Sequence, residues 1–338
     1  MSRYQESERT KAIELIENSE LFEGSKSGGK FMGEKRPFVL SNGDYNLYKP
    51  IREEVKTYFQ KNDISWWGGR KPTPHTLSSQ IACLNHLYPI RKDKSEVLKI
   101  AQIICEDMID VLEITTDKFL PAYIAFEAVS DTDYLNECKE GQKLTRGSNC
   151  TSIDALIYAE HKNGRKYLLP IEWKYTEHYN NANKAVEDRK GEPKGTNGKG
   201  NERLGRYVSD NHNHPNLISN SKQLTKCNDY KSSVYFLEPF YQLMRQTLWA
   251  EQMIAHRNTE EISAVDFIHS HIIPQENSDL LNKVYPYSGK TMEATWRECL
   301  QDQSKYKIIS PEDLLANIDY NKYAGLKEYL RERYWEFK

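Results

Sequence analysis

The chain has 338 residues, of which 38% are hydrophobic and 28% charged, and its formal net charge is -2. These values indicate a globular protein with a sizeable core, and they exclude a protein that is basic as a whole, although a single groove can still be basic. No apolar run reaches the roughly 18 residues of a membrane span, the first residues lack the apolar core of a signal peptide, and the six cysteines form no CxxC pair, so we expect a cytoplasmic protein with reduced thiols.

Hydrophobic periodicity and turn residues divide the chain into helices and strands. The predicted helices span 4–19, 46–61, 75–87, 94–113, 238–256 and 320–335. The predicted strands span 121–129, 151–159, 166–176, 232–236 and 265–273. Lys162-Asn163-Gly164 is strong turn chemistry and predicts a hairpin between the second and third strands. The polar, Gly-rich stretch 180–206 predicts a mobile, mildly basic loop.

We find no internal repeat and no convincing linker, so one α/β domain with helical elaborations is the simplest interpretation. We predict an N-terminal helical elaboration at 1–74, a core at 75–273, and a C-terminal helical extension at 274–338 that packs on this core.

The predicted hairpin carries an acidic residue on one strand and a Glu-x-Lys on the next. Because strand side chains alternate between faces, Leu169, Ile171 and Trp173 should meet the core, and Glu172 and Lys174 should share the opposite face. Asp154 begins the preceding strand and should come close to both. Two converging carboxylates repel each other unless a cation lies between them.

Carboxylate oxygens favour Mg²⁺, with Mn²⁺ as an alternative, and Mg²⁺ can polarise a phosphoryl oxygen and acidify a water. We expect Asp154 and Glu172 to bind the metal, and Lys174 to orient or help deprotonate the attacking water. The backbone carbonyl of Trp173 is a further candidate ligand. Glu127 is a candidate third carboxylate, or a ligand of a second metal. The alternative is a solvated salt-bridge cluster on an edge strand.

The helix at 238–256 presents Gln242, Arg245, Gln246 and Trp249 on one face. This face could hold phosphates or orient the acidic ligands, or it could be paired within the fold.

Three more polar residues are candidates for the surroundings of the acids. Glu177 could pair with Lys174 or with Arg245. Gln80 and Asn85 could support the metal ligands.

Two other patterns carry less weight. Gly24-x4-Gly29-Lys30 imitates a phosphate-binding loop, but Phe31 replaces the Ser or Thr that holds Mg²⁺, so we expect no nucleotide cofactor. His212 and His214 with Cys227 lack a fourth zinc ligand at a sensible spacing.

Asp154 and Glu172-Trp173-Lys174 resemble the core of the PD-(D/E)XK nuclease superfamily, with Ile153 in place of the usual Pro. More of the chain, from about 75 to 273, is similar to an uncharacterised bacterial branch of that superfamily. The matching motifs are Ser78-Ser79-Gln80 with Asn85, Phe126-Glu127, Ser152-Ile153-Asp154, Glu172-Trp173-Lys174-Tyr175-Thr176-Glu177 and Tyr241-Gln242-Leu243-Met244-Arg245-Gln246-Thr247-Leu248-Trp249. The resemblance implies a restriction-endonuclease-like fold, with a central mixed sheet flanked by helices, and Mg²⁺-dependent cleavage of DNA.

We therefore expect a DNA endonuclease that hydrolyses phosphodiesters with a metal-activated water. A catalytically silent module of the same fold, which binds DNA or protein, is the alternative from another class. A third reading is a repair or mobile-element nuclease for branched or single-stranded DNA, which an exposed Trp66 or Trp67 beside the cleft would favour. A homodimer would suit double-strand cuts, but no interface is legible in the sequence.

Overall fold

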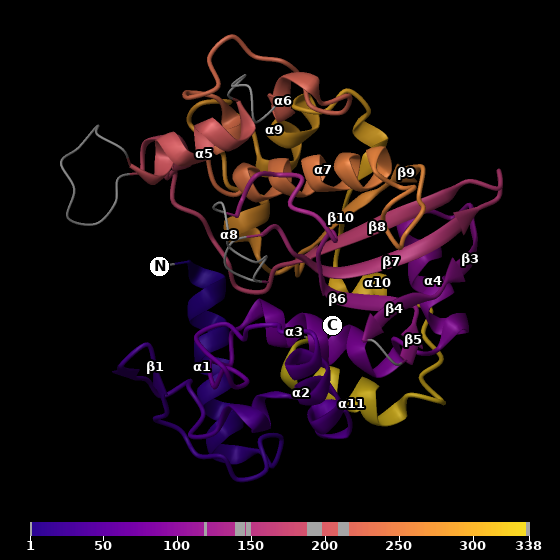
Figure 1. The fold of residues 1–338 in the computed structure, drawn as a ribbon. Helices are drawn as coiled ribbons and strands as arrows, with labels where there is room; N and C mark the ends of the chain where they lie inside the picture. Colours follow the sequence, from indigo (N-terminus) through magenta and orange to yellow (C-terminus); the bar gives the residue numbers. More distant parts are fainter. Residues whose placement is uncertain are drawn as a thin grey trace.

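A computed structural model of the chain describes residues 2–117, 120–138, 146, 150–187, 198–208 and 216–335 (Figure 1). Its α-helices are α1 (Arg3–Asn18), α2 (Arg52–Lys61), α3 (Ser79–Leu87), α4 (Lys94–Ile104), α5 (Lys199–Tyr207), α6 (Leu217–Asn220), α7 (Phe240–Ala255), α8 (Ser278–Leu281), α9 (Met292–Glu298), α10 (Pro311–Leu314) and α11 (Ala324–Arg333). Its strands are β1 (Lys30–Phe31), β2 (Glu34–Lys35), β3 (Met108–Leu112), β4 (Ile114–Asp117), β5 (Leu120–Ala122), β6 (Ile124–Ala128), β7 (Ile153–His161), β8 (Lys166–Trp173), β9 (Asp266–Phe267), β10 (His269–Ile272) and β11 (Tyr306–Ile309).

A mixed sheet of seven strands forms the centre of the described structure. The antiparallel hairpin of β7 and β8 lies in its middle. Along the free edge of β7, β6 pairs with the first half of that strand and β3 with the second half, both antiparallel. Along the other edge of β8, β9 and β10 run parallel to it, and β11 adds a further parallel strand beside β10. This is the central mixed sheet that we predicted.

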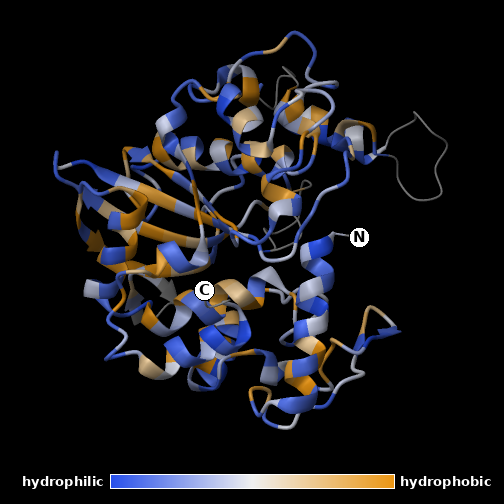
Figure 2. Ribbon diagram, turned by 180° about the vertical axis from the view of Figure 1, so that it is seen from behind, coloured by the Kyte–Doolittle hydropathy of each residue, from blue (hydrophilic) through white to orange (hydrophobic). Residues whose placement is uncertain are grey.

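Helices cover both faces of this sheet, α3 and α11 on one side and α7 and α9 on the other (Figure 1). The strands between these helices are largely apolar (Figure 2). Each face has its own buried cluster, because alternate residues of β7 and β8 point in opposite directions. Leu169, Ile171 and Trp173 belong to the cluster beneath α3, and Leu156 and Leu168 belong to the cluster beneath α7.

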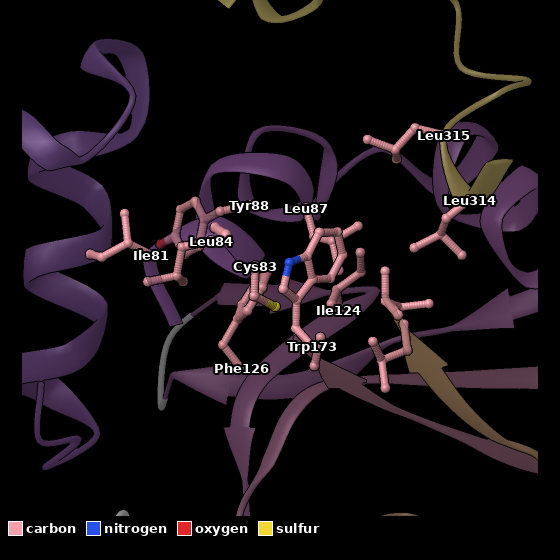
Figure 3. Close-up of a cluster of buried hydrophobic side chains, with 14 of the residues drawn as sticks. Ile81, Cys83, Leu84, Leu87, Tyr88, Ile124, Phe126, Trp173, Leu314 and Leu315 are labelled. Carbon is pink, nitrogen blue, oxygen red and sulfur yellow. The ribbon is translucent and has the colours of Figure 1, made fainter. Parts of the chain in front are cut away.

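Helix α3 packs its apolar face directly on the sheet, where Leu84 and Leu87 lie near Phe126 and Trp173 (Figure 3). The helix ends at Leu87 as predicted but begins at Ser79, four residues later than the predicted start at His75, because the Ser78 side chain accepts a hydrogen bond from the Ile81 amide and so caps the first turn there. The packing fixes β6 and β8, which carry candidate acids, against one rigid support.

The β7–β8 hairpin forms for the reason that the sequence indicates. Gly164 takes a φ of 78°, which a residue with a side chain rarely adopts, and the Asn163 side chain accepts from the Arg165 amide at 2.9 Å. The turn fixes the register, so it also fixes which residues of the two strands face each other.

Helix α1 is tied to the sheet and to α8. The Tyr4 amide donates to the Asp279 carboxylate at 2.9 Å, and the buried Glu8 carboxylate accepts a hydrogen bond from the Tyr175 hydroxyl. Tyr175 follows directly after the Glu-x-Lys sequence. The first helix therefore braces the segment that leaves the candidate site.

Several predicted elements are wrong in detail. The helix expected at 94–113 ends at Ile104, and β3 follows, with Met108 and Val111 buried and Ile109 54% exposed. A shift of register between Met108 and Asp110 lets both buried residues, three positions apart, face the core from a strand, and pairing with β7 outweighs the helical pattern. The helix expected at 46–61 is α only from residue 52, after a 3-10 turn at Lys49–Ile51 that contains Pro50.

Two expected non-helical segments are partly helical. The strand expected at 232–236 is a 3-10 turn at Val234–Phe236, which leads into α7 instead of joining a sheet. The loop expected at 180–206 contains a 3-10 turn at Lys184–Val186 and most of α5, and its residues 188–197 lie outside the described ranges. Gly200 suggested a loop, but it serves close packing, because a Cβ there would lie 2.2 Å from the Ala185 carbonyl oxygen.

The division at residues 74 and 273 stays a prediction. β11 was not expected, and it lies beyond the second boundary although it belongs to the central sheet.

All six cysteines are free, as their spacing suggested. In the part of the chain that the structure describes, no helix has both the length and the apolar character to cross a membrane.

Candidate active site

Three acidic residues occupy one row across three neighbouring strands. Glu127 of β6 falls between the paired residues Phe126 and Ala128, which places it opposite Asp154 of β7. Glu172 of β8 lies one step beyond the last pair of that hairpin and so also faces Asp154. Directly opposite residues of antiparallel strands share a face and lie close together. The row therefore gathers negative charge at one point on the sheet.

Lys174 meets this row on the side of β8. Its ammonium donates to Glu172 Oε1 at 2.5 Å. Both side chains are buried, with 5% of the Lys174 side chain and 7% of the Glu172 side chain exposed. The Asp154 carboxylate accepts from the Trp173 amide at 2.7 Å. The structure thus brings Asp154, Glu172 and Lys174 together, on the face opposite the core residues of β8, as the alternation predicted.

The electrostatics of the row follow from its burial. Burial raises the pKa of Asp154 well above its ordinary value, and the neighbouring charges of Glu172 and Glu127 raise it further. Burial opposes the charge of Lys174, but the Glu172 carboxylate and other nearby groups outweigh it, so the pKa of Lys174 lies well above its ordinary value. The carboxylates of the row outnumber the positive charges beside them, and the Lys174 ammonium holds its proton firmly.

Glu127 is held differently from the other two acids. Its φ of 49° departs from strand geometry, and its side chain accepts from Gln80 Nε2 at 2.7 Å and from the Ser152 hydroxyl at 2.8 Å. Burial is the main cause that raises its pKa, and the Glu172 charge adds to it. Gln80, a predicted supporting residue, therefore contacts a predicted ligand. Ser152 was part of the Ser152-Ile153-Asp154 motif, but the sequence analysis gave it no role.

Helix α7 supplies two amides to the row. Gln246 Nε2 donates to the second oxygen of Glu172, and Gln242 Oε1 accepts from Lys174 at 2.7 Å and from the Tyr179 hydroxyl at 3.1 Å. Gln242 and Gln246 are one helical turn apart, so they reach the Glu172–Lys174 pair from the same face. The expected polar face of this helix does point at the acids.

Arg245 has a partner that the sequence did not reveal. Its guanidinium pairs with the buried carboxylate of Glu137 at 2.7 Å. Glu137 also accepts from the Thr151 hydroxyl at 3.0 Å, the Tyr207 hydroxyl at 2.7 Å and the Thr151 amide. Glu137 and Arg245 are 108 residues apart, and no local pattern links them.

These residues enclose a cavity of about 200 Å³. The cavity is lined by Cys150, Thr151, Ser152, Asp154, Glu172, Gln242, Arg245 and Gln246. Asp154 and Glu172 contribute carboxylates to the lining, and Arg245, with 25% of its side chain exposed, contributes a positive charge. An anion that enters this cavity would meet Arg245, and a cation would meet the two carboxylates.

The donor set fits Mg²⁺ as a sparse site. No three His, Cys, Asp or Glu side chains within the described ranges come close enough to form a ligand group of their own. Mg²⁺ is commonly held by one or two carboxylates, with waters and substrate phosphates as its other ligands. Asp154 and Glu172 meet that requirement. The Glu127 carboxylate accepts hydrogen bonds from Gln80 and Ser152, as that of Glu172 does from Lys174 and Gln246, so its role as a third ligand stays a prediction.

Glu177 and Asn85 are the other two predicted supporting residues. Glu177 makes no ion pair with Lys174 or Arg245 within the described ranges, and its carboxylate accepts from the Tyr175 amide at 2.6 Å. Its charge nevertheless helps to raise the pKa of Lys174, so its supporting role stays a prediction. Asn85 is fully buried away from the acids, where it accepts from the Tyr48 amide and donates to the Tyr329 and Tyr334 hydroxyls.

Of the two histidine patterns in the sequence, the structure describes one, His269 and His271. His212 and His214, the discounted zinc pattern, lie outside the described residues. His271 of β10 is paired in register with Glu172, and His269 precedes it on the same face, so both belong to the buried surroundings of the acid row.

Comparison with known proteins identifies the family of the chain. Residues 20–335 match the model of a family described as "Restriction Endonuclease associating with ARP". No curated protein and no solved structure matches the chain. Since the match covers nearly the whole sequence, and the fold is a mixed sheet flanked by helices, the chain belongs to this restriction endonuclease family.

Proposed function

We propose that the protein is a Mg²⁺-dependent DNA endonuclease whose reaction takes place in the cavity between β7, β8 and α7. The observation that carries this proposal is that Asp154 and Glu172, from neighbouring strands, line one cavity, and that the Lys174 ammonium is bonded to Glu172 beside it. Family membership supports cleavage of DNA, and the two carboxylates support a hard divalent cation.

Asp154 and Glu172 would hold the metal, which when bound would polarise a phosphoryl oxygen and acidify a water. Lys174, held between Glu172 and Gln242, would orient the attacking water or help to deprotonate it. Gln242 and Gln246 hold Lys174 and Glu172 in place, and Arg245 would attract the phosphate.

The test is plasmid nicking by the purified protein with Mg²⁺, Mn²⁺ or EDTA. Lys174→Ala should abolish cutting. Lys166→Ala removes an exposed lysine at the start of β8, the strand that Lys174 follows, and should leave cutting unchanged. Cutting that persists in Lys174→Ala would refute the assigned site. No cutting of duplex, single-stranded or branched DNA by the unaltered protein would refute the activity.

One observation favours a catalytically silent module as the second candidate. Both oxygens of Glu172 already accept hydrogen bonds from Lys174 and Gln246, so the protein satisfies this carboxylate by itself. A silent module would bind DNA without cutting it, and Mg²⁺ would not raise its melting temperature. The family description also names an association with ARP, and we propose ARP as a partner for this chain without assigning residues to it.

A further inference from the structure

A basic surface with exposed apolar side chains lies on the N-terminal part of the fold, and we call it the Trp67 surface. It consists of the β1–β2 hairpin and the loop at 65–71, with the residues Lys26, Lys30, Met32, Lys35, Arg36, Trp67, Arg70 and Lys71. Figure 1 shows β1 at the periphery of the molecule, away from β9.

The two parts of the surface are packed on each other. The ring centroids of Phe31 and Trp67 are 4.5 Å apart, and each ring lies 5.0 Å from that of His75. Gly68, at a φ of 90°, makes room for Phe31, because a Cβ there would lie 2.5 Å from its ring. The adjacent Trp66 is buried and stacks on Phe59, so it anchors the loop.

This packing leaves the apolar tips in solvent. Met32 is 71% exposed and Trp67 is 42% exposed, and Met32 is held at the hairpin tip with a φ of 51°. Burial of large apolar side chains is the rule, so a methionine and a tryptophan presented together on a surface indicate a contact with another molecule.

Basic side chains surround these tips. Segments 26–36 and 65–71 contain six Lys and Arg residues and one acid, Glu34, in a protein whose net charge is -2. None of the six forms an ion pair with a residue that the structure describes. Five of the six are exposed, and Arg36 is half-buried. Arg70 and Lys71 also border a groove of about 690 Å³, whose lining includes two acids, Asp63 and the Asp44 that pairs with Lys56. Such a surface attracts a polyanion.

The Trp67 surface is connected to the acid row by two hydrogen bonds. The Trp67 amide donates to Gln80 Oε1 at 3.0 Å, and Gln80 Nε2 donates to Glu127 Oε1 at 2.7 Å. Glu127 in turn accepts from Ser152, which lines the cavity. The surface therefore borders the candidate active site on the side of β6.

We propose that the Trp67 surface binds the DNA strand that leaves the cavity, with its basic residues on phosphates and with Trp67 and Met32 against unstacked bases. This inference rests on the proposed nuclease function and makes DNA with unpaired bases, at a branch or in a single strand, the substrate class. Aromatic stacking on bases combined with a positive track is how proteins hold single-stranded DNA.

A protein partner is the competing occupant, and the charge pattern argues against it. Cores of protein interfaces are depleted of charged residues, whereas here unpaired cations surround the apolar tips on both segments. Nucleic-acid interfaces are, in contrast, strongly positive.

The test measures binding in EDTA to fluorescent DNA of three kinds: duplex, single-stranded and duplex with a single-stranded flap. Arg70→Ala/Lys71→Ala should weaken binding of all three, and each lost phosphate contact should lower the slope against log salt by about 0.7 to 0.9. Trp67→Ala should weaken only the DNAs with unpaired bases, by about 5-fold to about 100-fold. The control is Arg257→Ala/Lys307→Ala, two exposed basic residues next to the C-terminal end of α7 and on β11.

The outcomes separate this inference from the proposed function. If the unaltered protein binds and cuts DNA but the Arg70→Ala/Lys71→Ala variant binds like the control, the surface is wrongly assigned. If Trp67→Ala weakens duplex as much as single-stranded DNA, the contact with unstacked bases is refuted. If the unaltered protein neither binds nor cuts any of the three DNAs, the proposed function fails and this inference fails with it.

Discussion

Replacing Glu137 by Gln should destabilise the protein far more than loss of a surface ion pair. Glu137 is 4% exposed, and its carboxylate accepts from Arg245, Tyr207 and Thr151. The substitution keeps the shape but removes the charge, and it turns an NH₂ group toward at least one of these donors. Loss of one partner of a buried ion pair costs about 3–5 kcal/mol. Because 25% of the Arg245 side chain is exposed and water can replace part of the interaction, we expect about 2–3 kcal/mol.

The assay is urea unfolding at neutral pH with a matched control. Glu298→Gln removes the same charge from an exposed pair with Lys290, in which the side chains are 46% and 56% exposed, and should cost at most about 1 kcal/mol. A double-mutant cycle of Glu137→Gln with Arg245→Ala should give a coupling energy of about 1–3 kcal/mol. Equal losses in Glu137→Gln and Glu298→Gln, or a coupling near zero, would show that Glu137 does not hold the cavity wall together.

Three other predictions concern the metal, a buried histidine and the acid row. Mg²⁺ at 100 times its dissociation constant should stabilise the protein by about 2.7 kcal/mol in thermal denaturation, and Asp154→Ala should abolish this gain; an equal gain in the variant would contradict the metal assignment. Burial lowers the pKa of His86 from 6.5 to about 3, so the unfolded chain takes up a proton that the folded one does not, and the free energy of unfolding should fall by about 2 kcal/mol between pH 7 and pH 5. His86→Gln should flatten that pH profile by a similar amount, and an unchanged profile would speak against it. Gln80→Ala leaves the buried Glu127 short of a donor and should reduce the rate of DNA cutting more than DNA binding, whereas equal losses would point to a role in binding.

The structural basis of the His86 prediction is its fixed neutral form. Its Nδ1 lies 2.7 Å from the Ala82 carbonyl oxygen, which can only accept, and its Nε2 accepts from the Trp335 indole at 3.1 Å. A second proton on the ring would face that indole N–H. The fold therefore resists protonation of His86, and stability is fully present above its unfolded-state pKa.

The parts of the site that could be predicted from sequence are those that depend on short-range geometry. The turn at Asn163-Gly164 fixes the β7–β8 register, and the alternation within β8 places Glu172 and Lys174 on one face. Helical spacing likewise places Gln242 and Gln246 one turn apart on α7. These relations need no knowledge of distant segments.

The predictions that failed concern elements and contacts that depend on long-range packing. Met108 and Val111 fit a helix as well as a strand until β7 is available as a pairing partner. Glu137 precedes β7 by a segment without hydrophobic periodicity, and only the folded chain brings it to Arg245. Trp66 and Trp67 are neighbours of the same type, yet one is buried on Phe59 and the other is exposed. Sequence alone offers no means to tell them apart.

In this protein the start of the family match does not coincide with the start of the folded structure, because α1 precedes the match. The family match begins at residue 20, whereas α1 ends at Asn18 and holds Tyr175 through the buried Glu8. The region that matches the family and the region that this chain needs in order to close its own interior thus differ by one helix. A version trimmed to residues 20–335 would lose Tyr4 and Ala12 from the core and would expose the Tyr175 hydroxyl, so experiments on the protein should retain the first 18 residues.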